Sequence, residues 1–171
     1  MAILSQIQRR YSVRAYQNRP VEKAKLDAVL EAARLAPSAR NVQDWRFVVV
    51  TDAQTRARLV PAANNQVFVG EAPVVIACCS GNLDYVMRCG QPAYAINVAI
   101  AMEHMALQAV EEGLGTCWIG SFFEDQIRQI LGIPANVRVV ELMTLGYPMD
   151  TPRPKTREPV EKIVCHDRWR F

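Results

Sequence analysis

The sequence is poor in the residues that build metal sites and disulfide frameworks. It contains only two histidines, His104 and His166, and no pair among its five cysteines has the CxxC spacing of a zinc or redox site. The odd cysteine count, the adjacent pair Cys78 and Cys79 and their apolar surroundings favour reduced core thiols. We therefore expect neither a metal site nor a disulfide framework.

Long apolar runs and strong charge are also lacking. No apolar stretch approaches the ~20 residues of a membrane span, and residues 1–10 lack the apolar run of a signal peptide. The net charge of +3 is too weak to indicate a nucleic-acid partner, and few aromatic residues are interleaved with the basic clusters. These absences predict a cytoplasmic protein with no membrane and no nucleic-acid partner.

The chain does contain enough apolar sequence for one packed domain. It has 171 residues, of which 50% are hydrophobic, and a chain of this size buries about two thirds of its unfolded surface on folding. We predict a single domain over residues 1–171. Within it, residues 148–171 are rich in proline, threonine, lysine and arginine, which predicts an extended arm that wraps a partner subunit.

Hydrophobic periodicity predicts both helices and buried strands. Apolar residues recur at helical spacing in three segments, residues 20–36, 93–112 and 124–131. Apolar or β-branched runs predict four strands, at residues 45–51, 73–79, 116–119 and 137–147. Strands buried on two faces need helices on either side, so the predicted fold class is α+β, with helices covering both faces of a sheet.

Two basic segments lie near opposite ends of the chain. Residues 9–14 (RRYSVR) hold three guanidinium groups and a hydroxyl, a set that can bind phosphate through charge-assisted hydrogen bonds. Residues 153–157 (RPKTR) would project three cations from one side of an extended chain. Taken alone, each segment is more typical of a solvated, basic surface. The alternative is that the two segments lie together in the fold and bind the same phosphate.

Two other segments carry groups suited to a flat ligand. Residues 36–45 (APSARNVQDW) gather donors and acceptors in one loop, and residues 117–121 (CWIGS) combine apolar walls with a glycine that allows close approach. The alternative for residues 36–45 is a capped turn before a strand, and the alternative for residues 117–121 is ordinary core packing. The GLGTCW run at residues 113–118 has tryptophan in place of the third glycine of GxGxxG and follows a helix, which argues against a dinucleotide-binding loop.

Taken in order, RRYSVR, PSARNVQDW, GLGTCWIG and PKTREP resemble the FMN-binding segments of the nitroreductase family. The resemblance spans nearly the whole chain. It implies a nitroreductase-like fold with a central mixed sheet, and an interlocked homodimer that exchanges its C-terminal arm and holds FMN at the interface. The implied activity passes electrons from NADH or NADPH to a nitroaromatic, a quinone or a related small acceptor in two half-reactions.

The resemblance also implies roles for residues of the two basic motifs. Arg10 and Ser12 would contact the phosphate of FMN, with Lys155 and Arg157 closing on it from the arm. Arg14 would lie near the pyrimidine edge of the flavin, where a cation stabilises the reduced ring and raises its potential. No catalytic side chain is implied, because FMN carries the redox chemistry.

The remaining cofactor-binding residues follow in the same way. The resemblance places residues 37–41 in the other subunit's site, Ile119 and Gly120 against the isoalloxazine, and Asn64 or Gln66 at the ring edge. The resemblance thus adds the following cofactor-binding residues to those of the two basic motifs: Tyr11, Pro37, Ser38, Ala39, Asn41, Asn64, Gln66, Ile119 and Gly120.

The chain departs from the family pattern at Asp44, which stands where the family usually has proline. We expect this acid close to the mouth of the site, with an effect on substrate preference. The alternative functions are a flavoenzyme of the same fold that performs reductive dehalogenation or oxygen-dependent chemistry, and a non-enzymatic flavin-binding module. The first alternative needs a substrate-covering lid, for which residues 79–93 are the only candidate and are short.

Overall fold

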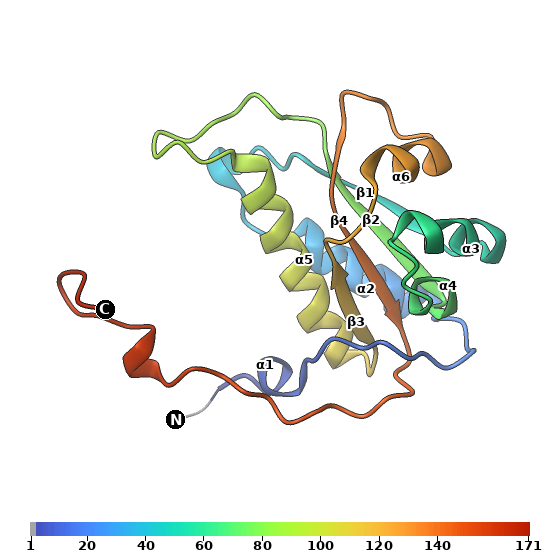
Figure 1. Ribbon diagram of the computed structural model, residues 1–171, viewed down its shortest axis with the longest axis horizontal. Helices are drawn as coiled ribbons and strands as arrows, with labels where there is room; N and C mark the ends of the chain where they lie inside the picture. The colour runs from blue at the N-terminus through green and yellow to red at the C-terminus, as the bar shows by residue number, and fades with distance from the viewer. Residues whose placement is uncertain (1–2) are drawn as a thin grey trace.

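The structure is a computed structural model that describes residues 3–171 (Figure 1). Its strands are β1 (Trp45–Val50), β2 (Val74–Ser80), β3 (Gly115–Ile119) and β4 (Arg138–Gly146). Its α-helices are α1 (Ser5–Arg9), α2 (Lys23–Arg34), α3 (Ala53–Ala62), α4 (Phe68–Glu71), α5 (Ala93–Glu111) and α6 (Glu124–Leu131). Every predicted strand and helix is confirmed with shifts of a few residues at its ends. Helices α1, α3 and α4 have no predicted counterpart. Helices α1 and α4 are short, and the apolar residues of α3 form only a weak helical pattern.

The four strands form one sheet in the order β1-β2-β4-β3, and each pair of neighbours is antiparallel. We expected a mixed sheet, but the paired strands are all antiparallel. Among the described residues, the parallel pairing is an isolated bridge between Ser12 and Thr116. Strand β2 is buried at every position although its neighbours are antiparallel. Its run of apolar residues is continuous because helices cover both faces of the sheet. The run therefore does not indicate whether the neighbouring strands are parallel or antiparallel.

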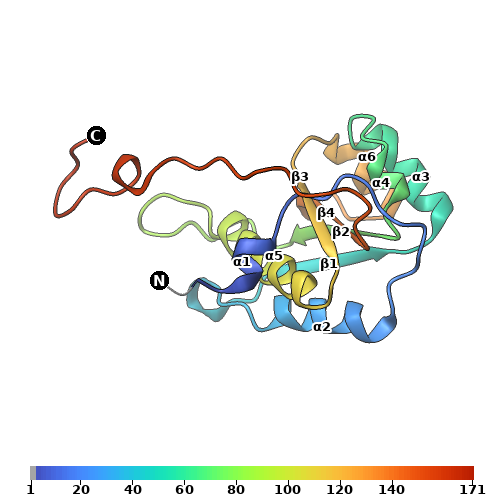
Figure 2. The same cartoon turned by 90° about the horizontal axis from the view of Figure 1, so that it is seen from below.

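Alternate side chains of β2 belong to two cores on opposite faces of the sheet. Val74, Ile76 and Cys78 pack with residues of α2 and α5, whereas Val75, Ala77 and Cys79 pack with residues of α3, α4 and α6. Figure 2 shows the sheet between α2 on one side and α3, α4 and α6 on the other. The predicted α+β architecture with helices on both faces is confirmed. Helix α5 buries residues along most of its length because it lies between the sheet, α1 and α2.

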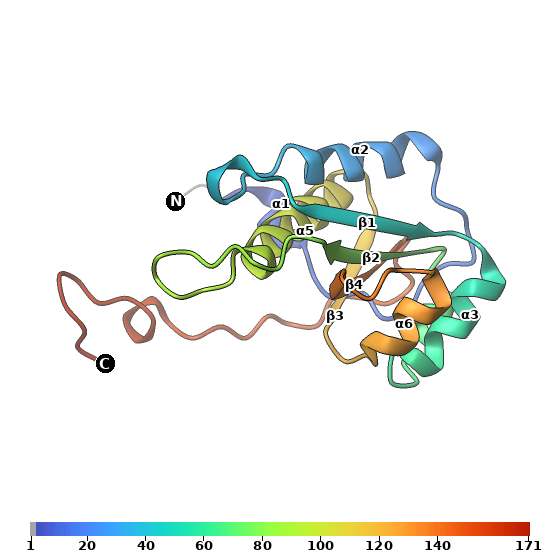
Figure 3. The same cartoon turned by 90° about the horizontal axis from the view of Figure 1, so that it is seen from above.

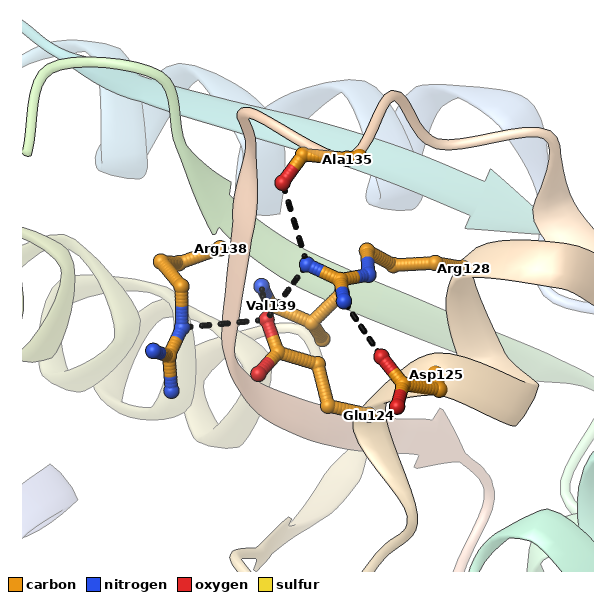
Figure 4. Close-up of polar contacts among 6 residues, drawn as sticks. All are labelled: Glu124, Asp125, Arg128, Ala135, Arg138 and Val139. Carbon is orange, nitrogen blue, oxygen red and sulfur yellow. Dashed lines mark hydrogen bonds and ion pairs between the residues drawn. The ribbon is translucent and has the colours of Figure 1, made fainter.

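Helix α6 is fixed to the start of β4 by a polar cluster (Figure 4). Glu124 at the start of α6 accepts a hydrogen bond from the Val139 backbone N–H at 2.9 Å and forms an ion pair with Arg138 Nε at 3.1 Å. Arg128, one turn further along α6, pairs with both Glu124 and Asp125.

The chain after Pro148 leaves the body as an extended arm. Residues 151–164 are exposed throughout, and in Figure 1 the arm runs beneath α1 and away from the sheet. Large apolar side chains on it face solvent, among them Ile163 and Trp169, of which Trp169 is 82% exposed. The role of the arm in wrapping a partner subunit stays a prediction.

The five cysteines are free. Cys78, Cys79 and Cys117 are buried, as expected of core thiols, but Cys89 is exposed and Cys165 is partly exposed, so the expectation holds for only three of them. Within residues 3–171, no helix is long and apolar enough to cross a membrane, and no cluster of three potential metal ligands occurs.

Candidate functional site

The segment after α1 lies directly against β3. The Val13 N–H donates to the Thr116 carbonyl oxygen at 3.0 Å, next to the bridge between Ser12 and Thr116. Gly115 permits this approach, because a Cβ at that position would lie 2.3 Å from Val13 Cγ2. The first basic motif and the third motif of the resemblance are therefore neighbours in space.

Asp150 ties the start of the arm to the same segment. The Tyr11 hydroxyl donates to the Asp150 carbonyl oxygen at 2.8 Å, and the Arg14 backbone N–H donates to Asp150 Oδ2 at 3.0 Å. Burial and the nearby Asp150 carboxylate raise the pKa of Tyr11 to about 12, so the phenol keeps its proton and acts as a donor. Tyr11, Ser12, Arg14 and Asp150 line a cavity of about 440 Å³.

A second cavity, of about 420 Å³, brings the two basic motifs together. Arg10 meets Lys155 and Arg157 of the arm there, with Glu103 and Trp118 also in the wall. Lys155 Nζ donates to the Ile7 carbonyl oxygen at 3.3 Å and also to that of Gln8, which holds the arm against the end of α1. This cavity, called the cationic cavity below, brings Arg10 together with Lys155 and Arg157, whereas Ser12, Arg14 and Arg153 line the cavity beside Tyr11.

Two residues that line the cationic cavity each carry a buried N–H donor without a partner among the described residues. Arg10 Nε and Trp118 Nε1 are buried and make no hydrogen bond within the part of the chain that the structure describes. An unpaired buried N–H costs about 1–3 kcal/mol, so such groups usually await an acceptor. Acceptor oxygens on an anion would satisfy both donors, and the residues present therefore fit a phosphate group.

Trp118 lies in this wall because it alternates with its neighbours along β3. Cys117 and Ile119 face the core on the α3 and α6 side of the sheet, so Trp118 points to the opposite face. The sequence suggested Trp118 only as an apolar wall for a ring, and it gave no role to Glu103. Successive side chains of a strand point to opposite faces of the sheet, so the predicted strand could have shown that Trp118 and Ile119 face different sides.

A different group of predicted residues gathers at the end of β3. Asn64 Nδ2 donates to Ser121 Oγ at 3.1 Å, and Gln66 Nε2 donates to the Ser121 carbonyl oxygen at 3.1 Å. Ile119 is 2% exposed, so its side chain is core and only its backbone can face a ligand. Gly120 is exposed beside it.

Glu141 on β4 lies next to Gly120. A Cβ at Gly120 would be 3.1 Å from Glu141 Oε1, and Glu141 Oε2 is buried without a partner among the described residues. Burial raises the pKa of Glu141 above its ordinary value. The sequence analysis missed this acid, although a glutamate inside the apolar run of β4 was a visible signal.

The loop before β1 does not join either cavity. Pro37, Ser38, Ala39 and Asn41 line neither the cationic cavity nor the one beside Tyr11. Instead the Ala39 N–H donates to Asn97 Oδ1 at 2.9 Å, which places the loop at the start of α5 (Figure 3). Within one chain, the structure thus separates these predicted residues from the basic motifs.

Asp44 lines neither the cationic cavity nor the one beside Tyr11, so its expected place at the mouth of the flavin site stays a prediction. Its side chain is buried, with 6% of the residue exposed, and it accepts hydrogen bonds from Asn97 Nδ2 at 2.8 Å and Ser80 Oγ at 3.2 Å. A carboxylate with two internal donors stays in the protein interior. Asp44 also lines a cavity of about 360 Å³, together with Arg46 and Asn82.

Comparison with known proteins gives a consistent result. The family model described as "Nitroreductase family" matches residues 7–80 and 63–147. A Thermus thermophilus protein named NADH dehydrogenase is 33% identical, over 95% of this chain and 93% of its own. A Methanothermobacter thermautotrophicus protein named putative NADH dehydrogenase/NAD(P)H nitroreductase is 32% identical, over 99% of this chain and 88% of its own.

Solved structures show the same relationship. A nitroreductase family protein from Clostridium difficile superposes with a TM-score of 0.88 at 33% identity, covering 99% of this chain and 100% of its own. The NADPH:FMN oxidoreductase from Vibrio harveyi, solved in complex with NAD+, superposes with a TM-score of 0.88 at 26% identity, covering 98% of this chain and 78% of its own.

Proposed function

The chain belongs to the nitroreductase family, and on that premise we propose that it is an FMN-dependent oxidoreductase. It takes electrons from NADH or NADPH and passes them to a nitroaromatic, a quinone or a related small acceptor in two half-reactions at one site. The names of its relatives support the cofactor and the donor. The acceptor class rests on the family resemblance.

The cationic cavity is the observation that carries this proposal. Arg10, Lys155 and Arg157 supply positive charge, and the unpaired Arg10 Nε and Trp118 Nε1 supply donors for phosphate oxygens. FMN, when bound, supplies the electron transfer itself, which accounts for a site built from binding groups. Arg14, exposed beside Ser12, provides a cation for the flavin ring.

A second copy of the chain completes the site in this proposal. Residues 37–41 lie apart from the cationic cavity of their own chain, and the arm presents apolar side chains such as Ile163 and Trp169 to solvent. A homodimer that exchanges arms would bury these side chains. It would also bring the loop of one subunit to the cavity of the other.

The test begins with the purified protein. It should be yellow, release FMN on denaturation, and bleach anaerobically when NADH or NADPH is added. A bound flavin that stays oxidised with both donors would contradict the reductase assignment and favour the flavin-binding module.

The phosphate assignment has its own test. Arg10→Gln combined with Arg157→Gln removes charge-assisted hydrogen bonds worth about 1.5–3 kcal/mol each, so the variant should lose FMN. Arg168→Gln is the matched control, because it removes an exposed arginine of the same arm that lines neither cavity. Full FMN occupancy in the double variant would contradict the phosphate site.

A further inference from the structure

The loop before β1 has an unusual backbone for a segment without glycine. Arg40, Asn41 and Gln43 have φ values of 54°, 54° and 49°. This left-handed region is strained for L side chains, and several such residues in one short loop persist only when their surroundings fix them. The loop therefore depends on contacts that hold it.

The strongest of these contacts come from the buried pair Asp44 and Asn97. Asn97 Oδ1 accepts from the Ala39 N–H at 2.9 Å, while Asn97 Nδ2 donates to Asp44 Oδ1 at 2.8 Å. The other Asp44 oxygen accepts from Ser80 Oγ at 3.2 Å at the end of β2. A continuous hydrogen-bonded path thus joins the sheet and α5 to the loop.

The carboxylate of Asp44 also decides which way the Asn97 amide points. A carboxylate only accepts hydrogen bonds, so the NH₂ group of Asn97 must face Asp44. The Asn97 oxygen then faces the loop and accepts from Ala39. Without an acceptor at position 44 the amide is free to turn, and its NH₂ group would then face the Ala39 N–H without a bond.

We propose that Asp44 and Asn97 form a clamp of two positioning residues, which holds residues 37–43 in the conformation that binds the flavin ring of FMN. The inference rests on the proposed function, because that function assigns the loop to the cofactor site. Position 44 is where the family resemblance expects proline, which has no side-chain acceptor.

Single substitutions give the first test. Asp44→Ala and Asn97→Asp should each weaken both FMN and riboflavin by roughly tenfold or more, because the ring contact is lost and the phosphate contact is kept. In Asn97→Asp two carboxylates face each other, whereas Asp44→Asn combined with Asn97→Asp restores one donor and one acceptor. The double variant should regain affinity. Asp84→Asn, an exposed change on the neighbouring β2–α5 connection, is the control and should bind as the wild type does.

Hydrogen exchange gives a readout that needs no flavin. The Ala39 amide should exchange faster in Asp44→Ala than in the wild type and return to protection in the double variant. Unchanged exchange and unchanged affinity in Asp44→Ala would overturn the clamp while leaving the proposed function intact. A wild type that binds no flavin would overturn the proposed function, and with it the role of the clamp.

Mixed dimers separate positioning from a general loss of stability. One subunit carries Asp44→Ala, and the other carries Arg10→Gln and Arg157→Gln. If the loop of one subunit serves the cavity of the other, one of the two sites in the mixed dimer contains no altered group, and about half of the FMN should return. No recovery of FMN in the mixed dimer would overturn the action of the clamp on a partner's site.

Discussion

Replacing Trp118 by phenylalanine should weaken FMN binding and leave riboflavin binding unchanged. Trp118 lines the cationic cavity with Arg10, Lys155 and Arg157, and its indole N–H is buried without a partner among residues 3–171. A hydrogen bond from this group to a charged phosphate oxygen is worth about 1.5–3 kcal/mol, which corresponds to roughly a 10- to 150-fold rise in Kd for FMN. The variant without cofactor should lose little stability, because the removal of an unpaired buried donor offsets the loss of apolar contact.

Titration of the cofactor-free protein, followed by the quenching of flavin fluorescence, measures both affinities. Riboflavin is the matched control, since it has the same ring and lacks the phosphate. An equal loss of affinity for FMN and riboflavin would place Trp118 against the ring, as the sequence first suggested. No change for either ligand would refute the reasoning from the unpaired N–H.

Three further predictions use other parts of the site. Burial raises the pKa of Glu141 above 4.5, so its contribution to stability is complete below pH 4.5 and is lost as the pH rises through the raised value. Glu141→Gln should therefore flatten the fall of Tm with rising pH above 4.5, as measured by thermal unfolding. Gly115→Ala would place a Cβ 2.3 Å from Val13 Cγ2, and chemical denaturation should show a loss of about 1–3 kcal/mol together with weaker FMN binding. Deletion of residues 149–171 removes Lys155 and Arg157, so sedimentation and absorbance should show a monomer without FMN.

The strands and long helices were predictable because burial on each face leaves a periodic apolar pattern. The direction of the strands was not, since β2 is equally apolar whether its neighbours are parallel or antiparallel. Direction depends on the connections, and the helical pair α3 and α4 between β1 and β2 was absent from the prediction. Local patterns therefore predicted the strands and the long helices, but they did not predict the direction in which neighbouring strands run.

The candidate site was also predictable from the sequence only in part. Arg10 and Arg157 carry a recognisable chemistry, but their meeting depends on the path of the arm beneath α1. Asn97 and Asp44 acquire their role only through contacts between distant segments. A polar residue such as Asn97, 1% exposed inside an apolar helix, is nevertheless a signal that a buried partner exists.

The geometry of α5 explains why one chain does not bring all of these groups together. Asn97, which holds the loop, and Glu103, which lines the cationic cavity, are six residues apart, and this spacing puts them about 120° apart around the helix and about 9 Å apart along it. The loop and the cationic cavity therefore contact different parts of α5. The proposed homodimer would bring the loop of one subunit to the cavity of the other, and the arm, which leaves the body of the chain in Figure 2, is the segment that we expect to join the two copies.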